Sequence, residues 1–352
     1  MDIHEIVTKA RNNSVVNSVY DMVRLARDSR RAFKKFDIKG SKHIFERIKE
    51  AHEQYGWYPD EYFLYHYDDL SDDQRASFIG EKEHSVLSEA MNSHEAASVL
   101  ADKWETYRLF HDFFKREAIK VTCTRDLEAF NKLLKSKGHL IIKPLRGSFG
   151  KGIQIINDTV GSDYDYLLSD YPKGFIAEEV IEQDQRLGIL HLESVNTLRI
   201  HTICYEDRVE VFHPYIRIGR GKSIVDNAGG GGIFTSCNPD TGEVLTVVDE
   251  LGHSFTAHPD SGYPLIGYVV PCWDEAFKVA KQLAMHLPGL HYAGWDLALT
   301  KNGWVMVEGN PRAQMIFQIS ERKGFRGDMS AIMQKLNVTT PDVRFKAGRK
   351  TF

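Results

Sequence analysis

Residues 292–312 read YAGWDLALTKNGWVMVEGNPR, two apolar runs on either side of a Lys-Asn-Gly turn, which is the pattern of a β-hairpin. A two-residue Asn-Gly turn would place Asp296 opposite Gly309. A three-residue loop with a left-handed Gly303 would place Asp296 opposite Glu308 instead. We favour the second register because it gathers the acidic groups on one face of the hairpin.

The favoured register brings three oxygen-bearing side chains together. Glu308 and Asn310 are two residues apart and therefore share a face of their strand, and Asp296 joins them from the opposite strand. Two carboxylates and an amide oxygen are hard ligands of the kind that Mg²⁺ prefers. The pattern predicts a metal site at Asp296, Glu308 and Asn310, although a pair of acids at a sheet edge would look the same.

A second motif lies upstream in residues 139–152, HLIIKPLRGSFGKG. Proline cannot donate to a strand ladder, so the strand should end at Lys143. The glycines that follow let the backbone approach an anion closely. The spacing fits neither the P-loop nor the Rossmann fingerprint. A phosphate-binding loop and a flexible hairpin both remain open; the phosphate-contacting candidates are Lys143, Gly147, Ser148, Gly150, Lys151 and Gly152.

Two further features lie between these motifs. Arg199 falls inside an apolar strand, where a guanidinium needs an anion, either a structural carboxylate or a terminal phosphate. Residues 225–244 contain four consecutive glycines, which suit a mobile flap over a reacting phosphate or an ordinary loop. The candidates for contacting a second substrate are Arg217, Asn227, Gly230 and Gly231.

Composition narrows the class of protein. The 352 residues carry a net charge of −4 with a pI near 6.4, which argues against general nucleic-acid binding. Four widely spaced cysteines suit reduced thiols, and no run of about 18 apolar residues predicts a membrane span. We therefore expect a cytoplasmic protein.

The predicted secondary structure changes from helical to mixed near residue 100. Residues 1–95 are predicted to be helical and include a basic run from Arg24 to Lys35, either a solvated helix face or a surface for an anionic lipid or polymer. Short strands and an amphipathic helix over 273–288 follow. We predict an α+β protein with a helical region at 1–95, lobes at 96–182 and 183–335, and a tail at 336–352.

Taken in order, these motifs resemble the ATP-grasp superfamily over roughly residues 55–325. More narrowly, they look like the sugar-transfer-associated or TupA-like branch, which is encoded beside polysaccharide and teichuronopeptide biosynthesis. The stretches that carry the resemblance include IIKPLRGSFGKGI, FIAEEVI, SVNTLRIHT, DNAGGGGI and GWDLALTKNGWVMVEGNPR. The resemblance implies an ATP-grasp fold, in which two α+β lobes hold ATP between two sheets.

The resemblance also implies roles for individual residues. Lys103 and Lys143 would hold the α- and β-phosphates under the 147–152 loop, and Arg199, helped by Arg312, would meet the γ-phosphate. The catalytic cations would then be Lys143, Arg199 and Arg312. The adenine hinge would be Glu178, Glu179, Val180 and Ile181, with the ribose contact among Glu182, Gln183 and Asp184, and Mg²⁺ would lie on Asp296, Glu308 and Asn310.

The reaction that the family implies starts from ATP and Mg²⁺. A carboxylate attacks the γ-phosphate to give an acyl phosphate and ADP, and an amine then displaces phosphate. We expect a carboxylate–amine ligase for small molecules such as an amino acid or a sugar-polymer precursor. We expect no nucleic-acid partner. The oligomeric state is left open, and a homodimer is one alternative. The alternatives are a kinase-like phosphotransferase and a non-catalytic nucleotide-binding protein.

Overall fold

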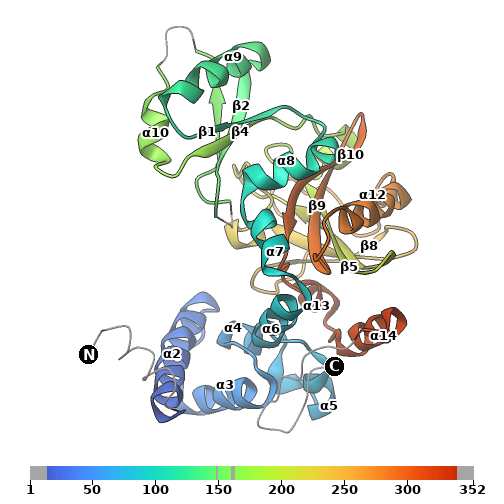
Figure 1. The fold of residues 1–352 in the computed structure, drawn as a ribbon. Helices are drawn as coiled ribbons and strands as arrows, with labels where there is room; N and C mark the ends of the chain where they lie inside the picture. Colours follow the sequence, from blue (N-terminus) through green and yellow to red (C-terminus); the bar gives the residue numbers. More distant parts are fainter. Residues whose placement is uncertain (1–13, 148–149, 160–162, 339–352) are drawn as a thin grey trace. The chain divides into compact units, whose positions relative to one another are not determined.

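The computed structural model describes residues 14–147, 150–159 and 163–338, which fall into two compact units (Figure 1). The first unit contains residues 14–87 and 322–338, and the second contains residues 88–321.

The first unit is helical, as predicted for the N-terminal region. Its longest helix, α2 (Ser14–Lys35), buries Leu25, Ser29 and Ala32, which recur at the spacing of one helix face. The elements that follow are α3 (Lys42–Tyr55), α4 (Pro59–Leu64), η1 (Tyr67–Asp69), α5 (Asp72–Ser77) and α6 (Glu81–Met91), whose last residues belong to the second unit. Among the described residues, no helix is long and apolar enough to cross a membrane.

The basic run predicted between Arg24 and Lys35 lies on α2. The side chains of Arg24, Arg27 and Arg31 are 51%, 57% and 73% exposed, and all three lie within 3.6 Å of Asp28. Exposed ion pairs of this kind contribute little to stability. The arrangement fits a solvated helix face, and a role in binding an anionic surface stays a prediction.

The first unit also contains α14 (Arg326–Leu336). The guanidinium of Arg326 lies 2.5 Å from both carboxylate oxygens of the buried Glu83 and donates to the carbonyl of Ala76 at 2.8 Å. Gly324 packs against Ser77 so tightly that a Cβ there would lie 2.3 Å from the Ser77 carbonyl carbon. We predicted residues 183–335 as one lobe, but the structure instead joins residues 322–338 to the N-terminal helices. The four predicted domain stretches otherwise stay a prediction.

The second unit contains a four-stranded antiparallel sheet in the order β1-β4-β2-β3. Helix α9 (Leu127–Lys137) packs on it and buries Phe130, Leu133 and Leu134 against Leu140 and Phe175. The elements of this region are α8 (Lys103–Phe114), β1 (Ala118–Val121), η2 (Thr124–Asp126), α9, β2 (His139–Pro144), β3 (Gln154–Asn157), α10 (Tyr166–Asp170) and β4 (Phe175–Glu179). β2 ends at Pro144, one residue beyond the predicted end at Lys143, and Pro144 still pairs with Phe175 of β4.

The second unit also contains a six-stranded antiparallel sheet in the order β10-β9-β5-β6-β7-β8. Its strands are β5 (Thr197–Tyr205), β6 (Arg208–Ile218), β7 (Ile233–Cys237), β8 (Val244–Asp249), β9 (Tyr292–Thr300) and β10 (Gly303–Asn310). The other elements are α7 (His94–Ala101), α11 (Gln185–Gly188), η3 (Ala228–Gly230), α12 (Trp273–His286) and α13 (Phe317–Glu321). These two sheets and the helical N-terminal region confirm the predicted α+β class.

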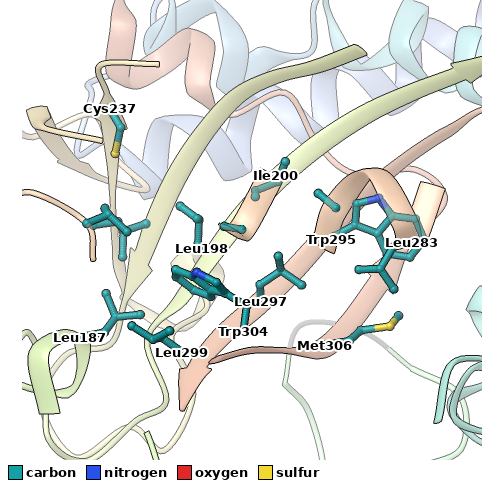
Figure 2. Close-up of a cluster of buried hydrophobic side chains, with 14 of the residues drawn as sticks. Leu187, Leu198, Ile200, Cys237, Leu283, Trp295, Leu297, Leu299, Trp304 and Met306 are labelled. Atoms are coloured by element: carbon teal, nitrogen blue, oxygen red, sulfur yellow. The ribbon is translucent and has the colours of Figure 1, made fainter. Parts of the chain in front are cut away.

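The two faces of the six-stranded sheet differ because side chains alternate along a strand. One face carries Leu198, Ile200, Trp295 and Leu297, which form a buried core with α12, and Figure 2 shows this cluster. The alternate residues of the same strands point to the other face, and they include the charged residues predicted for the site.

The predicted pairing of Asp296 with Glu308 is confirmed, although the turn differs from both predicted forms. Thr300 pairs with Gly303 around a Lys301-Asn302 turn, which by itself would not set Asp296 opposite Glu308. The register then shifts by one residue between Met306 and Glu308, and this bulge restores the pairing. Gly303 has a φ of +85°, the left-handed conformation that the prediction required.

Candidate functional site

The four-stranded sheet buries two cations on one carboxylate. The Nζ of Lys143 lies 2.9 Å from Oε1 of Glu178, and Nε and Nη2 of Arg116 lie 2.9 and 2.5 Å from its Oε2. Burial alone would raise the pKa of Glu178, but the charges of Lys143 and Arg116 outweigh it and lower this pKa to about 2. Burial lowers the pKa of Lys143, an effect that Glu178 opposes.

Arg116 also connects the two sheets, because its Nη1 donates to the carbonyl of Met306 at 2.7 Å. Lys115, its neighbour, donates to the carbonyl of Asn302 at 3.3 Å. The end of α8 is thereby attached to strand β10, which carries Glu308. This attachment sets the Lys143–Glu178 pair beside the predicted metal-binding hairpin.

The predicted phosphate loop begins after β2. Lys103, the first residue of α8, donates through Nζ to the carbonyl of Gly147 at 2.8 Å. Gly147, Gly150 and Gly152 have φ values of +137°, +68° and +73°, which side chains disfavour. Lys151 is exposed, and the predicted Ser148 lies outside the described residues.

Gly150 also brings the loop against the second glycine-rich segment. A Cβ at Gly150 would lie 3.2 Å from a methyl carbon of Val225, just before the glycine run. In that run, Gly231 has a φ of +91°, and a Cβ at Gly232 would lie 2.7 Å from the carbonyl oxygen of Asp226. The conformation of both segments therefore depends on glycine.

The predicted adenine hinge follows β4. Glu179 accepts from the backbone N–H of Glu117 at 2.6 Å and from Lys137 at 2.7 Å, so its carboxylate is engaged. Val180 and Ile181 are half-buried, and none of the hydrogen bonds within the described residues uses their backbone groups. Free N–H and C=O groups at this point suit pairing with a planar base, and the hinge stays a prediction.

The residues predicted for ribose contact differ in what they already bind. Asp184 caps α11 and forms a two-bond contact with Arg186, at 2.9 Å for each bond. Gln183 bonds Asn196 through both its oxygen and its nitrogen. Glu182 is 85% exposed at its side chain and lies 3.7 Å from Lys301. Asp184 remains a predicted contact, although its carboxylate is already occupied within the chain.

The six-stranded sheet buries an alternating row of two arginines and two aspartates. Asp296 accepts from Nε and Nη2 of Arg199, the second at 2.8 Å, and from Nη1 of Arg217 at 2.7 Å. Nη2 of Arg217 lies 3.2 Å from Asp226. Burial would raise the pKa of Asp296, but the two arginines outweigh it and lower this pKa to about 2. The anion predicted for Arg199 is, in this structure, a carboxylate.

Glu308 is the central carboxylate of the candidate site. It is half-buried, and burial raises its pKa, although Lys103 opposes the shift; the charge of Asp296 raises this pKa further. Arg199 and Lys143 also act on it electrostatically. The cations that act on Glu308 therefore come from α8, the four-stranded sheet and the six-stranded sheet, and their joining in one site stays a prediction.

The donor set fits a hard divalent cation. Asp296 and Glu308 are cross-strand partners, and Asn310 is half-buried two residues further along β10. Among the described residues, no three His, Cys, Asp or Glu side chains gather as a metal cluster, so the predicted set depends on the Asn310 amide oxygen as its third ligand.

Four other predicted residues lie away from this buried row or are engaged differently. Arg312 is exposed and lies 3.8 Å from Glu89. The side-chain oxygen of Asn227 accepts from the N–H of Gly229 at 3.2 Å, and Gly230 and Gly231 have open space where a Cβ would lie. Their contacts to substrate stay predictions.

Sequence reasoning missed three participants. Glu178 was assigned to the hinge, yet it is the counter-ion of Lys143; Arg116 and Asp226 were not selected at all. A signal existed for Glu178 because an acid within the apolar run FIAEEVI needs a buried cation, just as Arg199 needed an anion. Asp226 offered no such signal, since an aspartate before a glycine run is typical of a solvated turn.

Comparison with known proteins bears on this geometry. Residues 165–334 match the family described as sugar-transfer associated ATP-grasp. These residues form an ATP-grasp region. The match contains Glu178, Arg199, Asp296 and Glu308, and it confirms the resemblance predicted from the sequence. Lys103, Lys143 and the first glycine loop precede it.

Several solved structures resemble this chain at low identity. D-alanyl-alanine synthetase A from Vibrio cholerae is 12% identical with a TM-score of 0.43, over 70% of this chain and 67% of that one. N5-carboxyaminoimidazole synthetase from Staphylococcus aureus, complexed with ADP, is 12% identical with a TM-score of 0.43, over 75% and 60%. L-amino acid ligase from Bacillus licheniformis is 15% identical with a TM-score of 0.38, over 66% and 45%. No curated protein sequence matches.

Proposed function

We propose that this chain is an ATP- and Mg²⁺-dependent carboxylate–amine ligase that releases ADP and phosphate, acting on an amino acid or a sugar-acid precursor. The observation that carries the proposal is the position of Glu308, within electrostatic reach of Lys103, Lys143 and Arg199 and directly opposite Asp296. Cations placed around hard oxygen donors are suited to binding a nucleoside triphosphate together with its metal ion.

In this proposal each group of residues has a physical task. Lys103 and Lys143 hold the inner phosphates, and Arg199 neutralises charge on the γ-phosphate, since phosphoryl transfer depends on position and electrostatics more than on a protein nucleophile. Asp296, Glu308 and Asn310 would hold Mg²⁺, which supplies charge neutralisation on the phosphate oxygens. The two glycine-rich segments exclude water from the reacting group.

The bond changes are as follows. A substrate carboxylate oxygen attacks the γ-phosphorus, and the bond from that phosphorus to the leaving oxygen of ADP breaks. The amine nitrogen of the second substrate then attacks the acyl carbon, phosphate leaves with the carbon–oxygen bond electrons, and the nitrogen loses a proton to solvent. Arg217 of β6, together with Asn227, Gly230 and Gly231 of the glycine-rich segment, would face the second substrate.

The test is a phosphate-release screen with Mg-ATP against pairs of amino acids and uronic acids, with Lys143→Met as the inactive variant and the exposed Lys132→Met as its matched control. ADP and phosphate should appear only when a suitable carboxylate and amine are both present. Hydroxylamine should trap a hydroxamate, which a hydroxyl-directed kinase would not give. AMP and pyrophosphate as products would contradict the proposal.

A further inference from the structure

Asp226 ends the buried row of charges on the six-stranded sheet. It is 7% exposed and accepts from the backbone N–H of Thr197 at 3.0 Å and from the Thr197 hydroxyl. Its other oxygen lies 3.2 Å from Nη2 of Arg217. Asp226 is therefore anchored to the first residue of β5, two residues before Arg199.

Arg217 is shared between two carboxylates. Nη1 donates to Asp296 at 2.7 Å, while Nη2 lies against Asp226, so only one guanidinium nitrogen contacts Asp296. A carboxylate has about four lone-pair positions. Arg199 occupies two positions on Asp296 and Arg217 occupies one, which leaves room for a further ligand.

The geometry without Asp226 follows from the shape of the guanidinium. Arginine prefers to bind a carboxylate through two parallel bonds. With its second nitrogen released from Asp226, Arg217 would bind Asp296 through both nitrogens. Asp296 would then lose its remaining free position and more of its negative charge.

We propose that Asp226 is a positioning residue for metal binding: by holding Arg217 in a one-nitrogen contact with Asp296, it keeps Asp296 able to accept a divalent cation. This inference rests on the proposed function, because it requires Asp296 to be a metal ligand. It adds a residue outside the predicted ligand set and gives the row of charges a task beyond structural pairing. Asp226 also directly precedes Asn227 and the glycine run, so the same contact fixes one end of that segment.

The test compares Asp226→Asn with a matched control, Asp249→Asn. Asp249 is equally buried at 7% exposure but accepts from Leu251 and His253 at the end of β8, and within the described residues it forms no ion pair with Arg199 or Arg217. Mn²⁺ affinity in the presence of ADP is measured by electron paramagnetic resonance, and ADP affinity in EDTA by calorimetry. Loss of an outer partner of a metal ligand typically weakens metal binding by 10- to 100-fold.

We expect Asp226→Asn to weaken Mn²⁺ binding by about tenfold, while ADP affinity in EDTA changes by less than about twofold and Asp249→Asn changes neither. Thr197→Val, which removes one hydroxyl donor to Asp226 at nearly constant shape, should weaken Mn²⁺ binding less and in the same direction. It supplies the test if Asp226→Asn does not fold.

Three outcomes would overturn the inference. If both aspartate variants behave alike, Asp226 has only a structural role. If Asp226→Asn weakens ADP binding equally in EDTA, it acts on the phosphates and not on the metal. If the unaltered protein shows no Mn²⁺ binding that depends on ADP, the proposed function fails and this inference fails with it, a result that is recognised before any variant is compared.

Discussion

The four-stranded sheet places two buried cations, Lys143 and Arg116, on the single carboxylate of Glu178. The six-stranded sheet instead pairs Arg199 with Asp296 and places Arg217 between Asp296 and Asp226. The first cluster has a surplus of positive charge, and the second is balanced. Buried surplus charge is costly unless a further counter-ion joins it. The four-stranded sheet is thus prepared for an anion such as phosphate.

The balanced cluster has a different neighbour. Glu308 is half-buried, has a raised pKa and forms no ion pair within the described residues. A cation bound beside such a carboxylate would stabilise its ionised form. Under the proposed function, the surplus of positive charge on the four-stranded sheet would meet the phosphates, and the unpaired Glu308 would meet the metal ion.

The largest expected effect is on the stability of the fold, and it directly tests the surplus of positive charge around Glu178. Glu178→Gln leaves Lys143 and Arg116 buried without a counter-ion, so we expect a loss of about 3–5 kcal/mol in the free energy of unfolding. Chemical denaturation followed by tryptophan fluorescence measures it, with the exposed Glu128→Gln on α9 as control. If Glu178→Gln loses no more unfolding free energy than Glu128→Gln, the charge of Glu178 does not stabilise the buried Lys143 and Arg116.

The next effect is on nucleotide binding. Lys143→Met removes the cation that we assign to phosphate but leaves the Arg116–Glu178 pair intact. We expect ADP affinity to fall by about 10- to 100-fold, the loss typical of a hydrogen bond to a charged group. Calorimetry measures it against Lys132→Met, and equal affinities for the two variants would remove Lys143 from the site.

The smallest effect is on the pH dependence of stability. The carboxylates of Glu178 and Asp296 should change the stability of the fold with pH in the opposite direction to Glu308. Because the pKa of Glu308 is raised on folding, its ionisation destabilises the fold as pH rises through that raised value. Glu178 and Asp296, with pKa values lowered to about 2, stabilise the fold above their ordinary range near 4, and this contribution is lost as pH falls toward 2.

Glu308→Gln should therefore remove the loss of stability that sets in as pH rises above the ordinary pKa of a glutamate, near 4, and leave the loss toward pH 2 unchanged. Thermal unfolding across about pH 2–8 measures both changes. If stability falls with rising pH in the variant as it does in the unaltered protein, Glu308 is not the group that titrates there.

Much of this comparison could be predicted from the sequence, and the parts that could not have physical reasons. The Asp296–Glu308 pairing was predicted from the residues of the hairpin turn. In the structure this pairing depends on a bulge near Val307, and no residue type in that stretch indicates a bulge. Lys143 was recognised from Pro144 and the glycines, because strand ends have local sequence signals.

Long-range partners were the harder part. Arg116 meets Glu178 across 62 positions of sequence. Arg217, predicted as a contact to a second substrate, instead meets Asp296 across 79 positions. Similarly, α14 joins the N-terminal helices through Arg326 and Glu83, 243 positions apart. Periodicity predicts the element but not which distant element completes its charges.

The most direct test of the central claim measures ADP binding with and without Mg²⁺ for the unaltered protein, Lys143→Met and Glu308→Gln. If phosphate lies on the four-stranded sheet and the metal on the hairpin, Lys143→Met weakens binding in both conditions, whereas Glu308→Gln abolishes only the gain that Mg²⁺ provides. Nucleotide affinity that neither variant changes would contradict the account.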